Sequence, residues 1–217
     1  MKKFAVVLAG CGVYDGAEIN EAVLTLLALE QNGASYQCFA PDMQQMHVIN
    51  HLTGEEMPES RNVLVEAARI ARGNIKNINE AKVDELDGLV VPGGFGAAKN
   101  LSDFAVNGTG MTVQKDFLEF AQAMHKAGKP IALICIAPAM AAKICGEGVQ
   151  CTVGNDKEVA AAIAAMGGEH IECPVSGAVV DASNKLVTTP AYMLAGSVSE
   201  AASGINECVR KLISLAG

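Results

Sequence analysis

Four short apolar runs, none of them interrupted by a charged side chain, constrain the fold of this chain more than any other feature. Glycine or proline borders each run, and stretches with apolar residues at helical spacing separate one run from the next. Uninterrupted apolar runs of this length are typical of strands buried on both faces of a parallel sheet. The four predicted strands are Phe4–Ala9, Tyr36–Ala40, Gly88–Val91 and Ile131–Ile134.

The helical stretches alternate with these strands, which predicts βαβ units. The predicted helices are Glu18–Gln31, Asn62–Arg72, Gln114–Ala127, Pro138–Cys145, Val159–Met166 and Val198–Leu215. Residues 43–57 are expected to form a small inserted hairpin, and Leu186–Thr188 a further strand. No repeat or linker divides the chain. We therefore expect one α/β domain over residues 1–217, a flavodoxin-like three-layer sandwich with a mostly parallel central sheet.

Composition excludes several classes of partner. The chain has 217 residues and a formal net charge of −8. An acidic chain without a basic face is not expected to bind nucleic acid or an anionic membrane surface. No apolar stretch approaches the roughly 20 residues of a membrane span, and the first apolar run stops at Gly10 without a cleavage site. We expect a cytoplasmic protein.

One of the seven cysteines is placed for chemistry. No two cysteines form a C-x-x-C pair, so neither a disulfide framework nor a zinc site is indicated. Cys135 directly follows the strand Ile131–Ile134, and helix-forming sequence begins within three residues. A side chain at such a strand-to-helix elbow is exposed at the carboxyl edge of the sheet, where ligands bind. The helix N-terminus behind it is expected to lower the pKa of the thiol.

The residues that follow the other strands supply backbone donors. Gly93 and Gly94 come after the third strand, and Ile136 follows the cysteine itself; their amides are candidates for an oxyanion hole. The glycines that follow the first strand, in Gly10–Gly16, miss the dinucleotide fingerprint because the third glycine is one residue late. No cofactor is therefore expected. No metal ion is expected either, because the sequence shows no cluster of ligand residues.

Two acids lie near the start of the first helix. Glu18 and Glu21 could both complement the helix dipole, although Glu21 lies a full turn further in, where that effect fades.

The chain resembles the ThiJ/PfpI superfamily of class I glutamine-amidotransferase-like proteins. The resemblance lies in Ile134–Pro138, in Val91–Gly94 and in Glu21. It is more specifically similar to the ElbB family, described as isoprenoid biosynthesis proteins and as glyoxalases. The stretches that support this closer similarity are CGVYDGAEINEA, APDMQQMHVINH, ESRNVLVEAARIARG and PGGFGAAKNLSDFA, and the resemblance covers essentially the whole chain.

The resemblance implies a glutamate that hydrogen-bonds the elbow cysteine. Glu21 lies twelve residues before Gly33, which matches the superfamily spacing, and Glu18 is the alternative. Superfamily proteases carry a histidine directly after the cysteine, where this chain has Ile136, so peptidase activity is not expected. Residues 187–193 contain neither the histidine nor the glutamate of a glutaminase triad.

The resemblance implies a cofactor-independent glyoxalase that converts glyoxal, a small dicarbonyl, to glycolate through Cys135, with carbonyl scavenging or protein deglycation as its role. Without the histidine, slow turnover is expected. The alternative is a non-enzymatic redox sensor or interaction protein linked to isoprenoid biosynthesis, which uses the same cysteine. Related proteins are commonly homodimers, so a homodimer is expected here.

Overall fold

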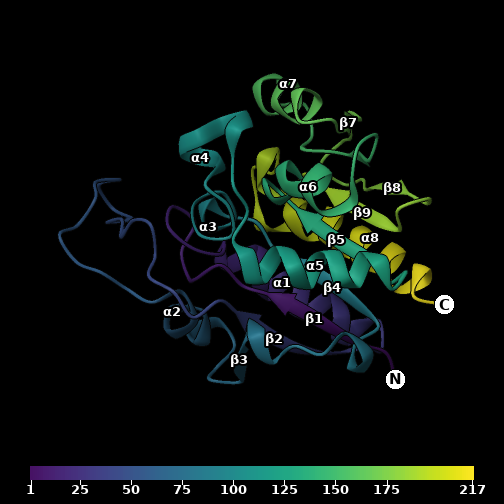
Figure 1. Ribbon diagram of the computed structural model, residues 1–217, viewed down its shortest axis with the longest axis horizontal. Helices are drawn as coiled ribbons and strands as arrows, with labels where there is room; N and C mark the ends of the chain where they lie inside the picture. The colour runs from purple at the N-terminus through teal and green to yellow at the C-terminus, as the bar shows by residue number, and fades with distance from the viewer.

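A seven-stranded sheet forms the centre of the computed structural model, which describes all of residues 1–217 (Figure 1). The strand order is β3-β2-β1-β4-β5-β9-β8, and every neighbouring pair is parallel except β8 and β9. The strands are β1 (Lys3–Val7), β2 (Ser35–Ala40), β3 (Ile75–Asn77), β4 (Gly88–Val91), β5 (Ile131–Ile134), β8 (Val179–Asp181) and β9 (Leu186–Thr189). The predicted mostly parallel sheet is confirmed.

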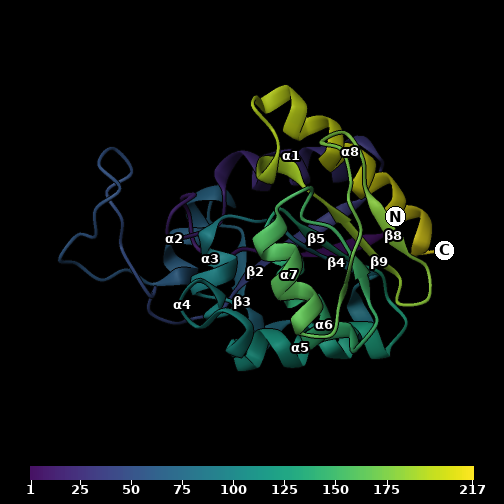
Figure 2. The same cartoon turned by 90° about the horizontal axis from the view of Figure 1, so that it is seen from above.

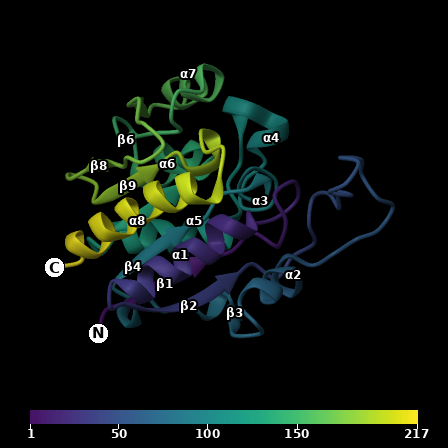
Figure 3. The same ribbon diagram turned by 180° about the vertical axis from the view of Figure 1, so that it is seen from behind.

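Helices cover both faces of this sheet. Figure 2 shows α1 and α8 on one side of the strands and α5 on the other, and Figure 3 shows α1 and α8 side by side. The helices are α1 (Ile19–Gln31), α2 (Val63–Ile70), α3 (Phe95–Lys99), α4 (Phe104–Asn107), α5 (Lys115–Lys126), α6 (Ala141–Cys145), α7 (Lys157–Ala165) and α8 (Val198–Leu215). The predicted three-layer sandwich is confirmed. None of these helices combines the length and the apolar character that crossing a bilayer would require.

Alternation along the buried strands produces two separate cores. In β4, Val90 belongs to the core beneath α1 and α8, while its neighbour Val91 belongs to the core beneath α5. In β5, Ile134 and Leu133 divide between the two cores in the same way. Because both faces are covered, these strands need apolar residues at every position, and this need explains the uninterrupted runs in the sequence.

Several short strands were not predicted from the sequence. The edge strand β3 has the sequence IKN, and a separate two-stranded parallel sheet joins β6 (Gln150–Cys151) to β7 (Glu169–His170). These strands have two or three residues, are partly polar, and therefore lack a detectable period. The antiparallel strand β8 was missed for the same reason.

The insertion after β2 is an extended arm, defined here as residues 43–62, which projects from the body of the molecule (Figures 1 and 2). Its two sides meet only at isolated antiparallel bridges, Gln44 with Asn62 and Ile49 with Glu56. The predicted hairpin is therefore present as a reversal of the chain without a continuous ladder. Residues 51–56, at the tip, are all exposed.

A buried amide side chain, Asn100, helps to attach the base of the arm to the body, together with Asp15, whose Oδ2 accepts from the N–H of Ile49 at 2.7 Å. Asn100 Nδ2 donates hydrogen bonds to the carbonyl oxygens of Ala9 and Asp15, each at 2.9 Å. Asn100 Oδ1 accepts from the backbone N–H of Met46, also at 2.9 Å. Three segments that are distant in sequence are thereby joined at a side chain that is only 2% exposed.

We predict that Asn100→Ala lowers the free energy of unfolding by about 2–4 kcal/mol, because it leaves several buried backbone groups without partners. Urea denaturation measures the change. The matched control is Asn79→Ala, at an exposed position whose side chain makes no comparable contacts, with an expected change within about 0.5 kcal/mol. Equal midpoints for the two variants would show that Asn100 does not join these segments.

Candidate active site

The loops at the carboxyl ends of β1, β4, β5 and β9 meet around Cys135. This residue has φ +63°, a left-handed conformation that is uncommon for a residue with a side chain. Its backbone N–H donates to the carbonyl of Thr189, at the end of β9, at 3.0 Å. A short 3₁₀ turn, Ala137–Met140, follows and leads into α6. The predicted strand-to-helix elbow is present, and its thiol reaches the wall of a cavity.

Gly93 allows the loop after β4 to approach the cysteine closely. A Cβ atom at Gly93 would lie 2.3 Å from the Cβ of Cys135 and 2.6 Å from Oε2 of Glu21. Neither contact is sterically permitted, so no other residue fits without displacing the site. The next residue, Gly94, has φ +93° and is the N-cap residue of α3.

Glu21 lies at the centre of this arrangement and is fully buried. Its Oε2 accepts from the N–H of Gly93 at 2.8 Å, and its Oε1 accepts from the N–H of Tyr192 at 3.1 Å. The carboxyl group is also within hydrogen-bonding reach of the Cys135 thiol. Burial raises the pKa of Glu21 to about 7, although all three hydrogen bonds act in the opposite direction.

Glu18 has a different position. Its Oε2 accepts from the N–H of Glu21 at 2.6 Å, so it caps the N-terminus of α1. Its side chain also lines the cavity. Of the two acids that the sequence left as alternatives, Glu21 is the one next to the thiol.

The expectation of a low thiol pKa was wrong. Burial and the adjacent Glu21 carboxylate raise the pKa of Cys135 well above its usual value. The amides of Gly94 and Ile136 stabilise the thiolate, yet they do not offset these two effects. The resting cysteine is therefore a thiol that needs a base in contact with it, and Glu21 occupies that position.

The expected oxyanion hole also needs correction. The N–H of Gly93 donates to Glu21 and is not free for a substrate oxygen. The N–H groups of Gly94 and Ile136 point at the Cys135 sulfur instead. Two of the three predicted donors thus lie beside the sulfur that would attack a carbonyl carbon.

Sequence reasoning missed Tyr192, which lies in the loop after β9. Its N–H holds Glu21, its ring lines the cavity, and its hydroxyl accepts from Asn20 Nδ2 at 3.1 Å. The preceding Ala191 has φ +44°, a strained conformation that directs the Tyr192 amide toward the carboxyl group. The rule that ligands bind beyond strand ends could have found Tyr192, because a strand was expected at Leu186–Thr188.

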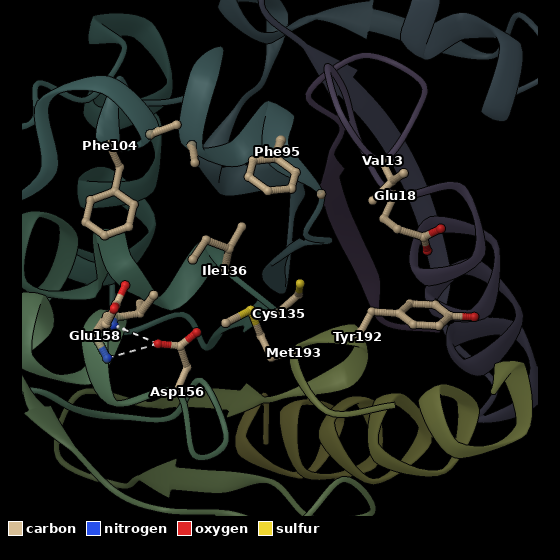
Figure 4. A pocket seen from close by; sticks show the side chains of 14 residues that line it. Val13, Glu18, Phe95, Phe104, Cys135, Ile136, Asp156, Glu158, Tyr192 and Met193 are labelled. Atoms are coloured by element: carbon tan, nitrogen blue, oxygen red, sulfur yellow. Dashed lines mark hydrogen bonds between the residues drawn. The ribbon is translucent and has the colours of Figure 1, made fainter. Parts of the chain in front are cut away.

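The cavity beside Cys135 has a volume of about 650 Å³. Figure 4 shows the aromatic rings of Phe95 and Phe104 on one side and Tyr192 and Met193 on the other. The full lining is Val13, Glu18, Gly94, Phe95, Ala98, Phe104, Ala105, Cys135, Ile136, Asp156, Glu158, Val159, Tyr192 and Met193. Nucleophile, amide donors and cavity form one continuous site.

The lining contains neither a basic residue nor a histidine. The structure also contains no cluster of three or more histidine, cysteine, aspartate or glutamate side chains that could hold a metal ion. The titratable groups that line the cavity are those of Glu18, Asp156, Glu158, Cys135 and Tyr192.

Residues 7–195 match the DJ-1/PfpI family. The chain is 48% identical over 225 residues to the human protein named glutamine amidotransferase-like class 1 domain-containing protein 3, mitochondrial, covering 99% of this chain and 84% of that protein. It is 47% identical, with the same coverage, to the rat ES1 protein homolog, mitochondrial.

Solved structures show the same similarity. An isoprenoid biosynthesis protein with an amidotransferase-like domain, from Ehrlichia chaffeensis, aligns over the whole of both chains with a TM-score of 0.94 and 36% identity. Glyoxalase III from Candida albicans shares the fold, with a TM-score of 0.62 and 14% identity over 99% of this chain and 97% of that one. The family match and the curated relatives lead to one conclusion: this chain belongs to the DJ-1/PfpI family.

Proposed function

We propose that this protein is a cofactor-independent glyoxalase that converts glyoxal to glycolate, with Cys135 as the nucleophile. One observation supports this most strongly. The thiol lies within hydrogen-bonding reach of a buried carboxyl group whose pKa is about 7, and two backbone amides point at the sulfur. A nucleophile, a proton acceptor matched to neutral pH and an oxyanion hole are the groups that addition to an aldehyde needs.

In the first step, the Cys135 sulfur attacks one aldehyde carbon of glyoxal and Glu21 accepts the thiol proton. The new sulfur–carbon bond gives an oxyanion that the amides of Gly94 and Ile136 stabilise. Glu21 then gives the proton to this oxygen, which completes the hemithioacetal and leaves Glu21 ionised for the next step. Because the proton moves as the bond forms, the high pKa of the resting thiol does not prevent reaction.

In the second step, Glu21 moves a proton from the carbon bound to sulfur to the neighbouring carbon through an enediolate, while the hydroxyl proton of the first carbon passes to the oxygen of the second. The first carbon is thereby oxidised to a thioester and the second is reduced to an alcohol. Water then cleaves the sulfur–carbon bond, which releases glycolate and restores the thiol. The oxidation and the reduction balance within the substrate, so no external hydride is required.

The alternative of a redox sensor is less well supported by the site. Rapid oxidation requires a cysteine with a low pKa and good solvent access. Cys135 is only 8% exposed, and its pKa is raised. The glyoxalase III from Candida albicans shows that a protein with that name has this fold, and the activity of the present chain is our proposal.

The remaining expectations about the molecule stay predictions. A homodimer is one, and a cytoplasmic location is another; the human and rat relatives are named as mitochondrial proteins. Protein deglycation is a further reaction that the same nucleophile could perform, since it too begins with attack on a carbon bound to oxygen.

We predict that Cys135→Ser reduces glycolate formation from glyoxal to the background rate, because a serine hydroxyl is a far weaker nucleophile at neutral pH. Chromatographic measurement of glycolate checks this. Cys145→Ser, at a half-buried cysteine outside the cavity lining, is the control and should retain the wild-type rate. Wild-type turnover by the Cys135 variant would refute the proposed nucleophile.

We predict that Glu21→Gln lowers kcat/KM by about 10²–10⁴-fold, the usual effect of removing a general acid or base. Only ionised Glu21 can accept the thiol proton, so wild-type kcat/KM should rise with pH and level off above a pKa of about 7. The rise should vanish in Glu21→Gln. Glu18→Gln should lose far less activity and keep a rising pH profile, shifted to lower pH because the charge of Glu18 contributes to the raised pKa of Glu21. The reverse result would assign the role to Glu18.

The titration of Glu21 also predicts a change in stability that does not require a substrate. Its pKa is raised from 4.5 to about 7 in the folded chain, so between these values the folded state holds a proton that the unfolded state has released. This contribution to stability is full below pH 4.5 and is lost as the pH rises through 7, at a cost of about 3 kcal/mol.

Urea denaturation between about pH 4.5 and pH 8 measures this dependence. In Glu21→Gln the free energy of unfolding should decline less over the same pH range, because glutamine does not titrate. Parallel curves for wild type and variant would contradict the raised pKa.

A further inference from the structure

The cavity beside Cys135 is much larger and less polar than glyoxal requires. Its volume is about 650 Å³, and ten of its fourteen lining residues are hydrophobic. Glyoxal has only four non-hydrogen atoms, whereas cavities of roughly 300–1,000 Å³ enclose drug-sized ligands. Most of the cavity wall would therefore remain out of contact with a bound glyoxal molecule.

The apolar part of the wall lies directly beside the nucleophile. Figure 4 shows Ile136 and Met193 near Cys135, with the rings of Phe95 and Phe104 further across the same cavity. Ile136 is the residue that takes the place of the histidine expected in related proteases, and its side chain faces the cavity. A substituent attached to the reacting carbonyl would thus contact hydrocarbon and aromatic surface, and its burial would contribute about 25 cal/mol for each Å².

All of the charged residues in the cavity wall are acidic. Glu18, Asp156 and Glu158 line the cavity, and no lysine, arginine or histidine does. The nearby Lys99 is held away, since its Nζ donates to the carbonyl of Tyr14 and lies 5.4 Å from the centre of the Phe95 ring. An anionic ligand would meet three carboxyl groups without a compensating cation.

We propose that the preferred substrate is an α-oxoaldehyde with a bulky apolar substituent, uncharged or cationic, and that carbonyl compounds bearing a carboxylate or phosphate are disfavoured. This inference rests on the proposed glyoxalase function and specifies the substrate class of the same site. It assigns Phe104 and Glu158 as residues that determine specificity.

Phenylglyoxal is a suitable neutral probe, and its reaction balances in the same way. The Cys135 sulfur bonds to the aldehyde carbon, and the thiol proton reaches the hemithioacetal oxygen by way of Glu21. A proton then moves from that carbon to the ketone carbon, and the hydroxyl proton of the hemithioacetal passes to the ketone oxygen. The ketone carbon thereby becomes the alcohol carbon and the first carbon becomes a thioester. Water breaks the sulfur–carbon bond and gives mandelate and the free thiol.

The experiment compares kcat/KM for glyoxal, phenylglyoxal and two para-substituted phenylglyoxals, one with a carboxylate and one with a trimethylammonium group. Acid formation is measured, with the Cys135→Ser rate subtracted as background. We expect phenylglyoxal to exceed glyoxal by at least about tenfold, since burying one ring contributes more than 1.4 kcal/mol. We expect the carboxylate compound to fall at least about tenfold below its trimethylammonium counterpart.

Two variants test the assigned residues. Phe104→Ala should reduce the preference for phenylglyoxal over glyoxal, whereas Val106→Ala, at an exposed position on the same helix α4, should leave that ratio unchanged. Glu158→Gln should reduce the difference in kcat/KM between the carboxylate and trimethylammonium compounds. Asp156 is not used, because its side chain caps α7 by accepting from the N–H groups of Glu158 and Val159.

The outcomes separate the two proposals. Turnover of glyoxal with no preference for phenylglyoxal, or with a preference for the carboxylate compound, would overturn the substrate class and leave the glyoxalase proposal standing. Absence of turnover for all four compounds would overturn the glyoxalase proposal and, with it, this inference.

Discussion

A single buried carboxyl group connects the parts of the candidate site. Glu21 belongs to α1, yet it accepts hydrogen bonds from the loop after β4 and from the loop after β9, and it faces the cysteine that ends β5. Four segments of the chain are therefore positioned relative to one another by one side chain. Its burial is costly for a charged group, so the site couples its geometry to the protonation state of this residue.

The cavity lining contains carboxyl groups and no basic side chain. Many cysteine enzymes stabilise a thiolate with a neighbouring cation. Here Cys135 faces a carboxyl group, so thiol and carboxyl titrate as a coupled pair. Such a pair suits reactions in which the same proton is taken up and returned within one cycle. The isomerisation of an α-oxoaldehyde is a reaction of this kind.

Much of the architecture could be predicted from the sequence because the central strands are buried on both faces. Their apolar runs, the helical spacing between them and the elbow at Cys135 are local patterns. The hydrogen-bond partner of the Gly93 N–H could not be predicted, because that partner is Glu21, 72 positions away in the sequence. The thiol pKa was mispredicted for a similar reason, since it depends on burial and on a neighbour from α1. Tyr192 was missed because its role depends on the direction of a backbone amide.

The left-handed backbone at Cys135 has a consequence for how such a protein can change over generations. A backbone conformation with φ +63° costs a residue with a side chain of the order of 1–3 kcal/mol in folding free energy. At Cys135 this conformation sets the direction in which the sulfur points. Glycine or asparagine adopts this conformation more readily. Folding alone therefore gives no reason to retain cysteine at the elbow. A change of this one codon could remove the nucleophile and leave the fold intact, and the descendant could keep the cavity as a binding site.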